Sequence, residues 1–271
     1  MPTQDSESTW LRRSPDSRSL WTLDVAKPVE LLRRFCALSN ARLPLIVLSH
    51  AGGSASSYVA WAAALQPVCE LWSVQLPGRE DRSSAPPARS VADVAEALAD
   101  EIEQCMVAPF AIFGHSLRAL IGYETSRLLA ARGAAAPVRL FLSAYRAPHL
   151  PSRYPPMSIL PQPEFIAAMQ RLYGKFPEAL LAAPDFFDRL MTVLRNDLKL
   201  METHRAGPPS RLPVPLVLLG GAEDEAVVQE ELEAWNIYAG AGMVLKMFPG
   251  GHFYLNDRLN AVPSVIVDFL R

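Results

Sequence analysis

The residue with the clearest chemical potential is a serine between an apolar run and a helix-forming segment. Ser116 lies in Gly114-His-Ser-Leu-Arg118, directly after the apolar run 110–113. A strand–turn–helix of this kind exposes a serine hydroxyl at the end of a strand and turns the amides of the helix start toward a developing oxyanion. The expected pattern is Gly-x-Ser-x-Gly, and four of its five positions match. At the fifth position, Arg118 replaces the glycine.

A serine hydroxyl becomes a nucleophile when a base takes its proton, and that base needs an acid to orient it. His252 lies in Pro-Gly-Gly-His-Phe-Tyr, immediately after the last predicted strand. It is therefore expected at the carboxyl edge of the sheet, where Ser116 also emerges. We predict that His252 is the base. Two of the other four histidines are expected to line the site (His50 and His115), and two belong to a segment outside the strand–helix pattern (His149 and His204).

The predicted acid follows another strand, in Gly221-Ala-Glu-Asp-Glu225. Three adjacent acids are also typical of a solvated loop. The chain order Ser, Asp, His is nevertheless that of the α/β-hydrolases, and the spacing Gly-x-x-Asp favours Asp224. Glu223 is the alternative.

The oxyanion donors are expected to be two backbone N–H groups, those of Leu117 and Ala51. Ala51 belongs to His50-Ala-Gly-Gly-Ser54, a glycine-containing loop that follows the first long apolar run. Glycines let such a loop turn sharply and approach a ligand closely. Loss of one donor lowers the rate about a hundredfold or more in enzymes of this kind, so the loop is part of the predicted site.

The elements that must position these residues alternate between apolar runs and segments with helical periodicity. This alternation predicts an α/β fold with a mostly parallel sheet flanked by helices, and the chain order Ser, Asp, His makes an α/β-hydrolase fold the expected version of it. Between Arg146 and Pro213 the alternation breaks, and proline-rich turns enclose two helical segments, which predicts a helical lid inserted at about 146–212. We expect residues 1–42 to form a partly irregular N-terminal extension and residues 43–271 to form the hydrolase domain. The predicted strands are 43–49, 70–76, 110–113, 138–143, 214–220 and 243–248, and the predicted helices are 90–106, 117–132, 163–172, 185–202 and 262–270.

Composition excludes several other classes of protein. The 271 residues are half apolar, enough for a substantial core, and a formal net charge of −2 argues against a nucleic-acid-binding protein. The three cysteines form no Cys-x-x-Cys pair and no Cys/His cluster has metal-ligand spacing, so we expect neither metal nor cofactor. The polar N-terminus lacks an apolar signal core, and no apolar run approaches the roughly 20 residues of a membrane span. We expect a cytoplasmic protein.

Several longer motifs resemble the type II thioesterases of polyketide and nonribosomal peptide biosynthesis. The resemblance extends from about residue 31 to the end of the chain, and its most specific pieces are Leu-Pro-Gly-Arg-Glu and Gly-Gly-His-Phe. The matching pieces are His50-Ala-Gly-Gly-Ser, Gln75-Leu-Pro-Gly-Arg-Glu-Asp-Arg82, Phe113-Gly-His-Ser-Leu, Arg146-Ala-Pro-His-Leu-Pro151, Leu194-Arg-Asn-Asp, Glu202-Thr-His-Arg205 and Phe248-Pro-Gly-Gly-His-Phe-Tyr-Leu255.

This resemblance implies hydrolysis of acyl or aminoacyl thioesters on the phosphopantetheine arm of acyl or peptidyl carrier proteins, which clears stalled or mis-primed chains. It implies Ser116 as nucleophile, Asp224 as orienting acid and His252 as base, with Ala51 and Leu117 as the oxyanion hole. The partner would be a carrier protein domain of a synthase, with no nucleic acid or membrane involved, and the enzyme is expected to be a monomer.

Arg118 is the departure from the family pattern. A large side chain at the tight elbow is expected to strain the turn or displace adjacent strand residues, unless it reaches a polar neighbour. We favour tolerance, because every other site position is intact, and expect Arg118→Gly to raise activity and stability. Three alternatives stay open: a catalytically impaired carrier-binding protein, a general carboxylesterase of the same fold, and, less favoured, a chain-terminating type I thioesterase.

Overall fold

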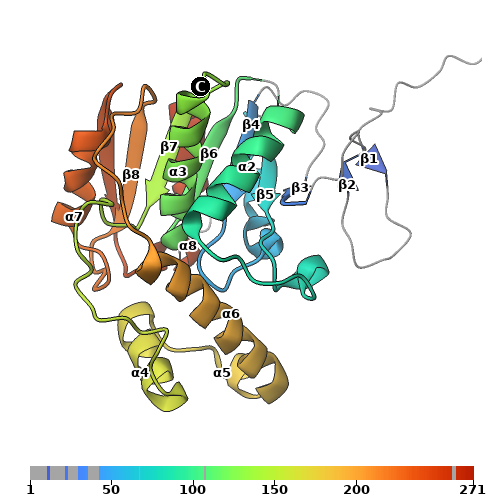
Figure 1. Cartoon of the computed structure of the whole chain (residues 1–271), viewed down its shortest axis with the longest axis vertical. Coiled ribbons are helices and arrows are strands. Elements are labelled where there is room, and N and C mark those ends of the chain that lie inside the picture. The colour runs from blue at the N-terminus through green and yellow to red at the C-terminus, as the bar shows by residue number, and fades with distance from the viewer. Residues whose placement is uncertain are drawn as a thin grey trace, which may run out of the picture.

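The protein folds around one seven-stranded sheet with the order β3-β5-β4-β6-β7-β8-β9 (Figure 1). The computed structural model describes residues 11–12, 22–23, 30–35, 43–66, 68–106, 108–257 and 261–271. Strand β3 runs antiparallel to β5, and all other neighbouring pairs in the sheet are parallel. The strands of the sheet are β3 (Leu32–Arg34), β4 (Leu43–Leu48), β5 (Cys69–Val74), β6 (Ala111–His115), β7 (Arg139–Ser143), β8 (Leu216–Gly221) and β9 (Met243–Phe248), and a separate pair joins β1 (Leu11–Arg12) to β2 (Thr22–Leu23).

Helices cover both faces of the sheet, which explains why its central strands are apolar throughout. In β4, Ile46 and Leu48 pack with the helices of one face, whereas Leu45 and Val47 pack with those of the other. The α/β class and all six predicted strands are therefore confirmed. One face is covered by α2 (Val91–Cys105), α3 (Leu117–Ala131) and α7 (Gln229–Glu233), and the other by α1 (Trp61–Leu65), α8 (Tyr254–Asp257) and α9 (Ala261–Leu270).

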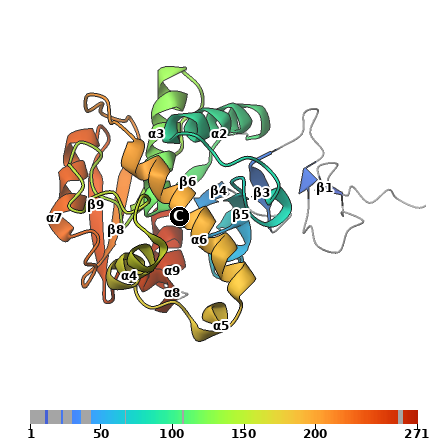
Figure 2. The ribbon, with the colours of Figure 1, turned by 60° about the horizontal axis from the view of Figure 1, so that its bottom comes forward.

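Three further helices lie between β7 and β8 in the chain and gather at one end of the sheet (Figure 1). They are α4 (Gln162–Tyr173), α5 (Glu178–Leu181) and α6 (Pro184–Thr203). Seen from that end, α6 runs across the sheet (Figure 2). The segment has a small core of its own, which includes Phe165, Met169 and Leu194. The two helices predicted for this segment are present.

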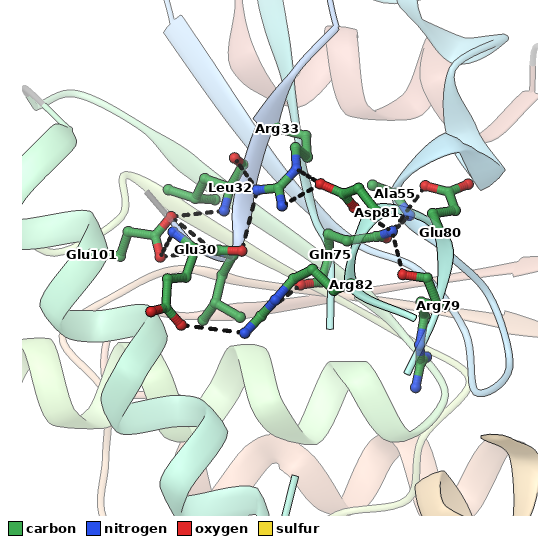
Figure 3. Close-up of polar contacts among 11 residues, drawn as sticks. Glu30, Leu32, Arg33, Ala55, Gln75, Arg79, Glu80, Asp81, Arg82 and Glu101 are labelled. Carbon is green, nitrogen blue, oxygen red and sulfur yellow. Dashed lines mark hydrogen bonds and ion pairs between the residues drawn. The ribbon is translucent and has the colours of Figure 1, made fainter. Parts of the chain in front are cut away.

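The edge strand β3 differs from the sequence prediction, which placed residues 32–34 in an irregular extension. The carboxylate of Glu101 on α2 accepts hydrogen bonds from the backbone N–H groups of Leu31 and Leu32, at distances down to 2.7 Å (Figure 3). This contact fixes the strand beside β5 from a position about 70 residues away, so local sequence does not reveal it. Most of the remaining residues up to 42 lie outside the described residues.

The strand order reverses between β4 and β6. From β4 the chain passes to β5 on one side and then returns to β6 on the other side. In parallel α/β sheets, ligands bind outside the carboxyl ends of the strands at such a switch point. The loops after β4 and β6 are the ones that carry Ala51 and Ser116. Within the described part of the chain, no helix is both long and apolar enough to cross a membrane.

Candidate functional site

Ser116 occupies a strained turn between β6 and α3. Its φ of +57° lies in the left-handed region, which a non-glycine residue adopts only when the surrounding structure imposes it. The turn is tight at Gly114, where a Cβ would lie 2.3 Å from the carbonyl oxygen of Arg118. The N–H of Ser116 donates to the carbonyl of Ser143 at the end of β7. The glycine that this elbow requires is therefore Gly114.

Ser116, His252 and Asp224 form a continuous hydrogen-bonded chain. Nε2 of His252 lies 3.0 Å from Oγ of Ser116, and Nδ1 lies 2.8 Å from Oδ2 of Asp224. The other carboxylate oxygen, Oδ1, accepts the N–H groups of Ala226 and Val227 at 2.8 and 3.2 Å. These bonds fix the carboxylate plane, so that one oxygen faces the imidazole.

The two acids in the loop after β8 differ in where they lie. Asp224 is buried and contacts His252, whereas Glu223 borders the cavity described below. The structure thus brings together the three residues predicted to act as nucleophile, base and acid, and it separates the alternative acid from the base.

The two predicted oxyanion amides border the same cavity as Ser116. Leu117 begins α3, and Ala51 lies in a turn in which the N–H of Gly53 donates to the carbonyl of His50. Neither the amide of Leu117 nor that of Ala51 has a hydrogen-bond acceptor among the residues that the structure describes. Both N–H groups are therefore available to an oxygen that develops negative charge beside Ser116.

Arg118 is fully buried and has a partner. Its Nη2 donates to Oδ2 of Asp197 on α6 at 2.8 Å, and the side chain is 1% exposed. The predicted polar neighbour is therefore present. The side chain leaves α3 toward α6, away from the tight contact at Gly114. Arg118 occupies a regular helical position, and the positive φ falls on Ser116.

A cavity of about 730 Å³ opens directly onto Ser116. One wall is formed by Ser116, His252 and the loop that contains Ala51. The helices α4 and α6 add a group of apolar side chains to the lining. These side chains are Met169, Leu172, Leu190, Leu194, Leu198 and Met201. The cavity can accommodate an apolar chain whose reactive carbon lies at Ser116.

Two other histidines lie near the predicted base, and both are held neutral. His50 lines the cavity, as predicted, whereas His115 is fully buried behind the site. Burial, and then the charge of Arg118, lower the pKa of His50 to about 4. Burial also lowers the pKa of His115 well below its usual value, and its Nδ1 pairs with the hydroxyl of Ser143. The His115 and His252 rings lie 5.1 Å apart. Neutral neighbours add no like charge when His252 takes up a proton.

Sequence reasoning missed two residues that contact this site. Tyr173 on α4 packs edge-on against His252 with ring centroids 4.8 Å apart, and it also lines the cavity. Nothing in the local sequence brings α4 to the base. Asp197 lies in Leu-Arg-Asn-Asp, one of the pieces that suggested the family resemblance, but the sequence assigns it no contact.

The chain is similar to known thioesterases over most of its length. The family model for the thioesterase domain matches residues 43–270. The chain is 35% identical to thioesterase PikA5 of Streptomyces venezuelae over 88% of this chain and 85% of that protein. It is 33% identical to the gramicidin S biosynthesis protein GrsT of Aneurinibacillus migulanus over 81% of this chain and 85% of that one. Among solved structures, the type II thioesterase BorB from the borrelidin biosynthetic cluster matches with a TM-score of 0.80 and 32% identity, over 89% of this chain and 98% of that one.

Proposed function

The chain belongs to the thioesterase family and is a type II editing thioesterase of polyketide and nonribosomal peptide biosynthesis. From this premise we propose its catalytic mechanism and its substrate class. Its substrates are acyl or aminoacyl thioesters on the phosphopantetheine arm of carrier proteins. Ser116 is the nucleophile, His252 the base and Asp224 the orienting acid. The observation that carries the proposal is the hydrogen-bonded chain of these three residues at the mouth of a largely apolar cavity.

In the first half-reaction, Oγ of Ser116 attacks the thioester carbonyl carbon while Nε2 of His252 takes the hydroxyl proton. The carbonyl oxygen becomes an oxyanion that accepts the N–H groups of Ala51 and Leu117. The tetrahedral intermediate then breaks its C–S bond. His252 returns the proton to the departing thiolate, which leaves an acyl-serine and a free phosphopantetheine thiol.

In the second half-reaction, water replaces the thiol. His252 takes a proton from this water, whose oxygen attacks the acyl-serine carbonyl, and the same two amides accept the new oxyanion. The Ser116 ester bond breaks, and the serine oxygen recovers its proton from His252. The products are a free carboxylic acid and the original enzyme.

Asp224 sets the direction of these proton transfers. Its Oδ2 accepts the Nδ1–H of His252, which leaves Nε2 unprotonated and able to accept the serine proton. The negative charge also stabilises the imidazolium formed during attack. Because Ala226 and Val227 donate to the other oxygen, the carboxylate keeps this orientation through the cycle.

The helices α4 and α6 supply the acyl-binding wall, and we assign the segment of about 146–212 as a lid. Two carboxylates in the C-terminal half of α6 hold this segment, one through the loop after β4 and one through residues of the lid itself. Glu202 accepts the backbone N–H groups of Met157 and Ser158, and Asp197 accepts that of Gly52. A thioester would reach Ser116 between this lid and the loop that contains Ala51.

Carrier-protein interaction accompanies this class of enzyme, and the acyl or peptidyl carrier protein domain of a synthase is the partner we propose. All three residues of the triad and the lid belong to one chain, which supports a monomer as the active unit. The thiols of Cys69 and Cys105 are unpaired, which is consistent with a cytoplasmic location beside the synthase.

The decisive experiment is hydrolysis of an acyl-phosphopantetheinyl carrier protein by wild type and by Ser116→Ala. We expect turnover by wild type and none above background in the variant. A carboxylic ester of the same acyl chain and an ordinary alcohol serves as the matched control substrate. Preference for this ester over the carrier thioester would favour a general carboxylesterase, and carrier binding without hydrolysis by wild type would favour an impaired binding protein.

A further inference from the structure

One buried carboxylate contacts both chain segments that carry the proposed oxyanion amides. Oδ2 of Asp197 accepts the N–H of Gly52, the residue after Ala51, at 2.8 Å. The same oxygen accepts Nη2 of Arg118, the residue after Leu117, at 2.8 Å. Asp197 therefore joins the loop after β4 to the start of α3 through two hydrogen bonds.

A second arginine completes the cluster. Nη1 and Nη2 of Arg79 donate to the two oxygens of Asp197 at 3.0 and 2.9 Å, and Nη1 also donates to the carbonyl of Gly53 at 3.0 Å. The carbonyl of Arg79 in turn accepts from the side-chain amide of Gln75 (Figure 3). The loop after β4 is thus bonded at two successive residues, Gly52 through Asp197 and Gly53 through Arg79.

The loop also packs directly against a side chain of α6. Gly52 has a φ of +75°, and a Cβ at this position would lie 2.7 Å from Cδ2 of Leu194. Small displacements of the loop would therefore either break the bond to Asp197 or press against Leu194.

The cluster is shielded from water and carries one net positive charge. The side chains of Arg118, Asp197 and Arg79 are 1%, 3% and 9% exposed. Burial would raise the pKa of Asp197, but Arg118 and Arg79 outweigh it and lower the pKa, so the carboxylate stays ionised. Burial lowers the pKa of Arg118 to about 10, which still leaves it charged at neutral pH. The charge acts on the cavity wall, since Arg118 contributes to the lowered pKa of His50.

We infer that Arg118 is a positioning residue, which, through Asp197, fixes the amide of Leu117 relative to the amide of Ala51. This inference rests on the proposed function, because it concerns the oxyanion hole of that reaction. A glycine at position 118 would leave the loop after β4 bonded to Asp197 and Arg79, but α3 would lose its bond to the same carboxylate.

Arg118→Gly should then impair the enzyme, contrary to the expectation from the sequence that it would improve activity and stability. The residue occupies unstrained backbone, so glycine relieves nothing at the turn. Its removal would leave a void where the guanidinium lies and would take one of four donors from a buried carboxylate. Misplacement of the amides by even a fraction of an ångström would affect the transition state more than substrate binding.

The test is a series of three variants at position 118. Arg118→Gly removes the side chain, Arg118→Met keeps much of its length without the charge, and Arg118→Lys keeps the charge. Arg132→Met is the matched control, since it removes a charge from the far end of the same helix, where Arg132 pairs with exposed acids. Two measurements are made below the unfolding temperature of every variant. One is kcat and KM on an acyl-N-acetylcysteamine thioester, and the other is the rate of Ser116 labelling by a fluorophosphonate.

We expect Arg118→Gly and Arg118→Met to lower kcat and the labelling rate by about 10- to 100-fold, with KM changed less than about threefold. Arg118→Lys should recover a substantial part of the loss, and Arg132→Met should stay within about twofold of wild type. If the Gly and Met variants lower only the unfolding temperature and keep kcat and labelling within about threefold, the positioning role is overturned and the residue is merely structural. If wild type is labelled but hydrolyses no thioester, the proposed function fails, while the labelling rates still decide the role of Arg118.

Discussion

Replacement of Asp224 by asparagine should disable the base without unfolding the protein. The change is one atom, and the structure determines how the new amide must lie. Oδ1 of Asp224 accepts two backbone N–H groups, those of Ala226 and Val227. The asparagine oxygen will take this place, because the NH₂ group would face two donors there. The NH₂ group then occupies the place of Oδ2 and faces Nδ1 of His252.

An N–H group that faces Nδ1 reverses the tautomer of the imidazole. Nδ1 must become the acceptor, so the proton moves to Nε2, which lies 3.0 Å from Oγ of Ser116. In this state Nε2 donates to the serine and cannot take its proton. Recovery of the productive tautomer requires the amide to flip, which breaks two backbone hydrogen bonds at about 0.5–1.5 kcal/mol each. The charge-assisted bond to the imidazolium, about 1.5–3 kcal/mol, is lost in either orientation.

Together these terms amount to about 4–5 kcal/mol in the middle of their range, which corresponds to a loss of about 10³–10⁴ in kcat. A loss of about 10⁴ follows the same substitution in a serine protease triad. The assay is steady-state hydrolysis of an acyl-N-acetylcysteamine thioester, together with thermal unfolding of wild type, Asp224→Asn and Asp224→Ala. Asp224→Asn should unfold close to wild type, whereas Asp224→Ala also leaves two amides without an acceptor and should lose about 1–3 kcal/mol of stability. A kcat for Asp224→Asn within tenfold of wild type would refute the assigned tautomer and with it the role of Asp224.

Three further predictions concern the elbow, the cavity wall and the edge strand. Gly114→Ala would place a Cβ 2.3 Å from a backbone oxygen and should lower the free energy of unfolding by about 3 kcal/mol or more in urea titrations. The control Gly207→Ala has open space around it and should change the free energy of unfolding little. Similar losses for both variants would contradict the tight elbow. The imidazole of His50 should titrate near pH 4 by NMR. Because the unfolded chain binds this proton more readily, the group should reduce the free energy of unfolding by about 2–3 kcal/mol as the pH falls from 6.5 to 4. Titration of His50 near pH 6.5 would disprove its burial as a neutral group. Glu101→Ala should leave the amides of Leu31 and Leu32 without their acceptor, reduce stability by about 2–3 kcal/mol and speed the hydrogen exchange of both amides. The control Glu103→Ala, at a more exposed position of the same helix, should change neither stability nor exchange at these amides. Unchanged exchange in Glu101→Ala would show that β3 does not depend on Glu101.

The sequence determined the six parallel strands of the sheet and which candidate residues meet at its carboxyl edge. The run Leu43–Leu48 is apolar on both faces, and this is sufficient to indicate a strand buried between two helical layers. Ser116, Asp224 and His252 each follow such a strand, and parallel strands bring their carboxyl ends to one edge, so strand order alone predicts that the three meet. The division into an extension and a hydrolase domain stays a prediction.

Only the tertiary structure decided which charges become partners. Arg118 and Asp197 are 79 residues apart, and the pairing depends on how α6 docks over the elbow. From the sequence, an arginine in place of an elbow glycine is expected to be tolerated only if it reaches a polar neighbour, because an unpaired buried charge is costly, and the sequence does not say which neighbour that is. Strand β3 was not predicted for the same reason. Two of its three residues are arginines, and the amide of its first residue, Leu32, bonds to Glu101 on α2. The spacing of apolar residues indicates which face of a helix or strand is buried. The partner of a charged residue depends on how distant elements pack, so the local sequence does not predict it.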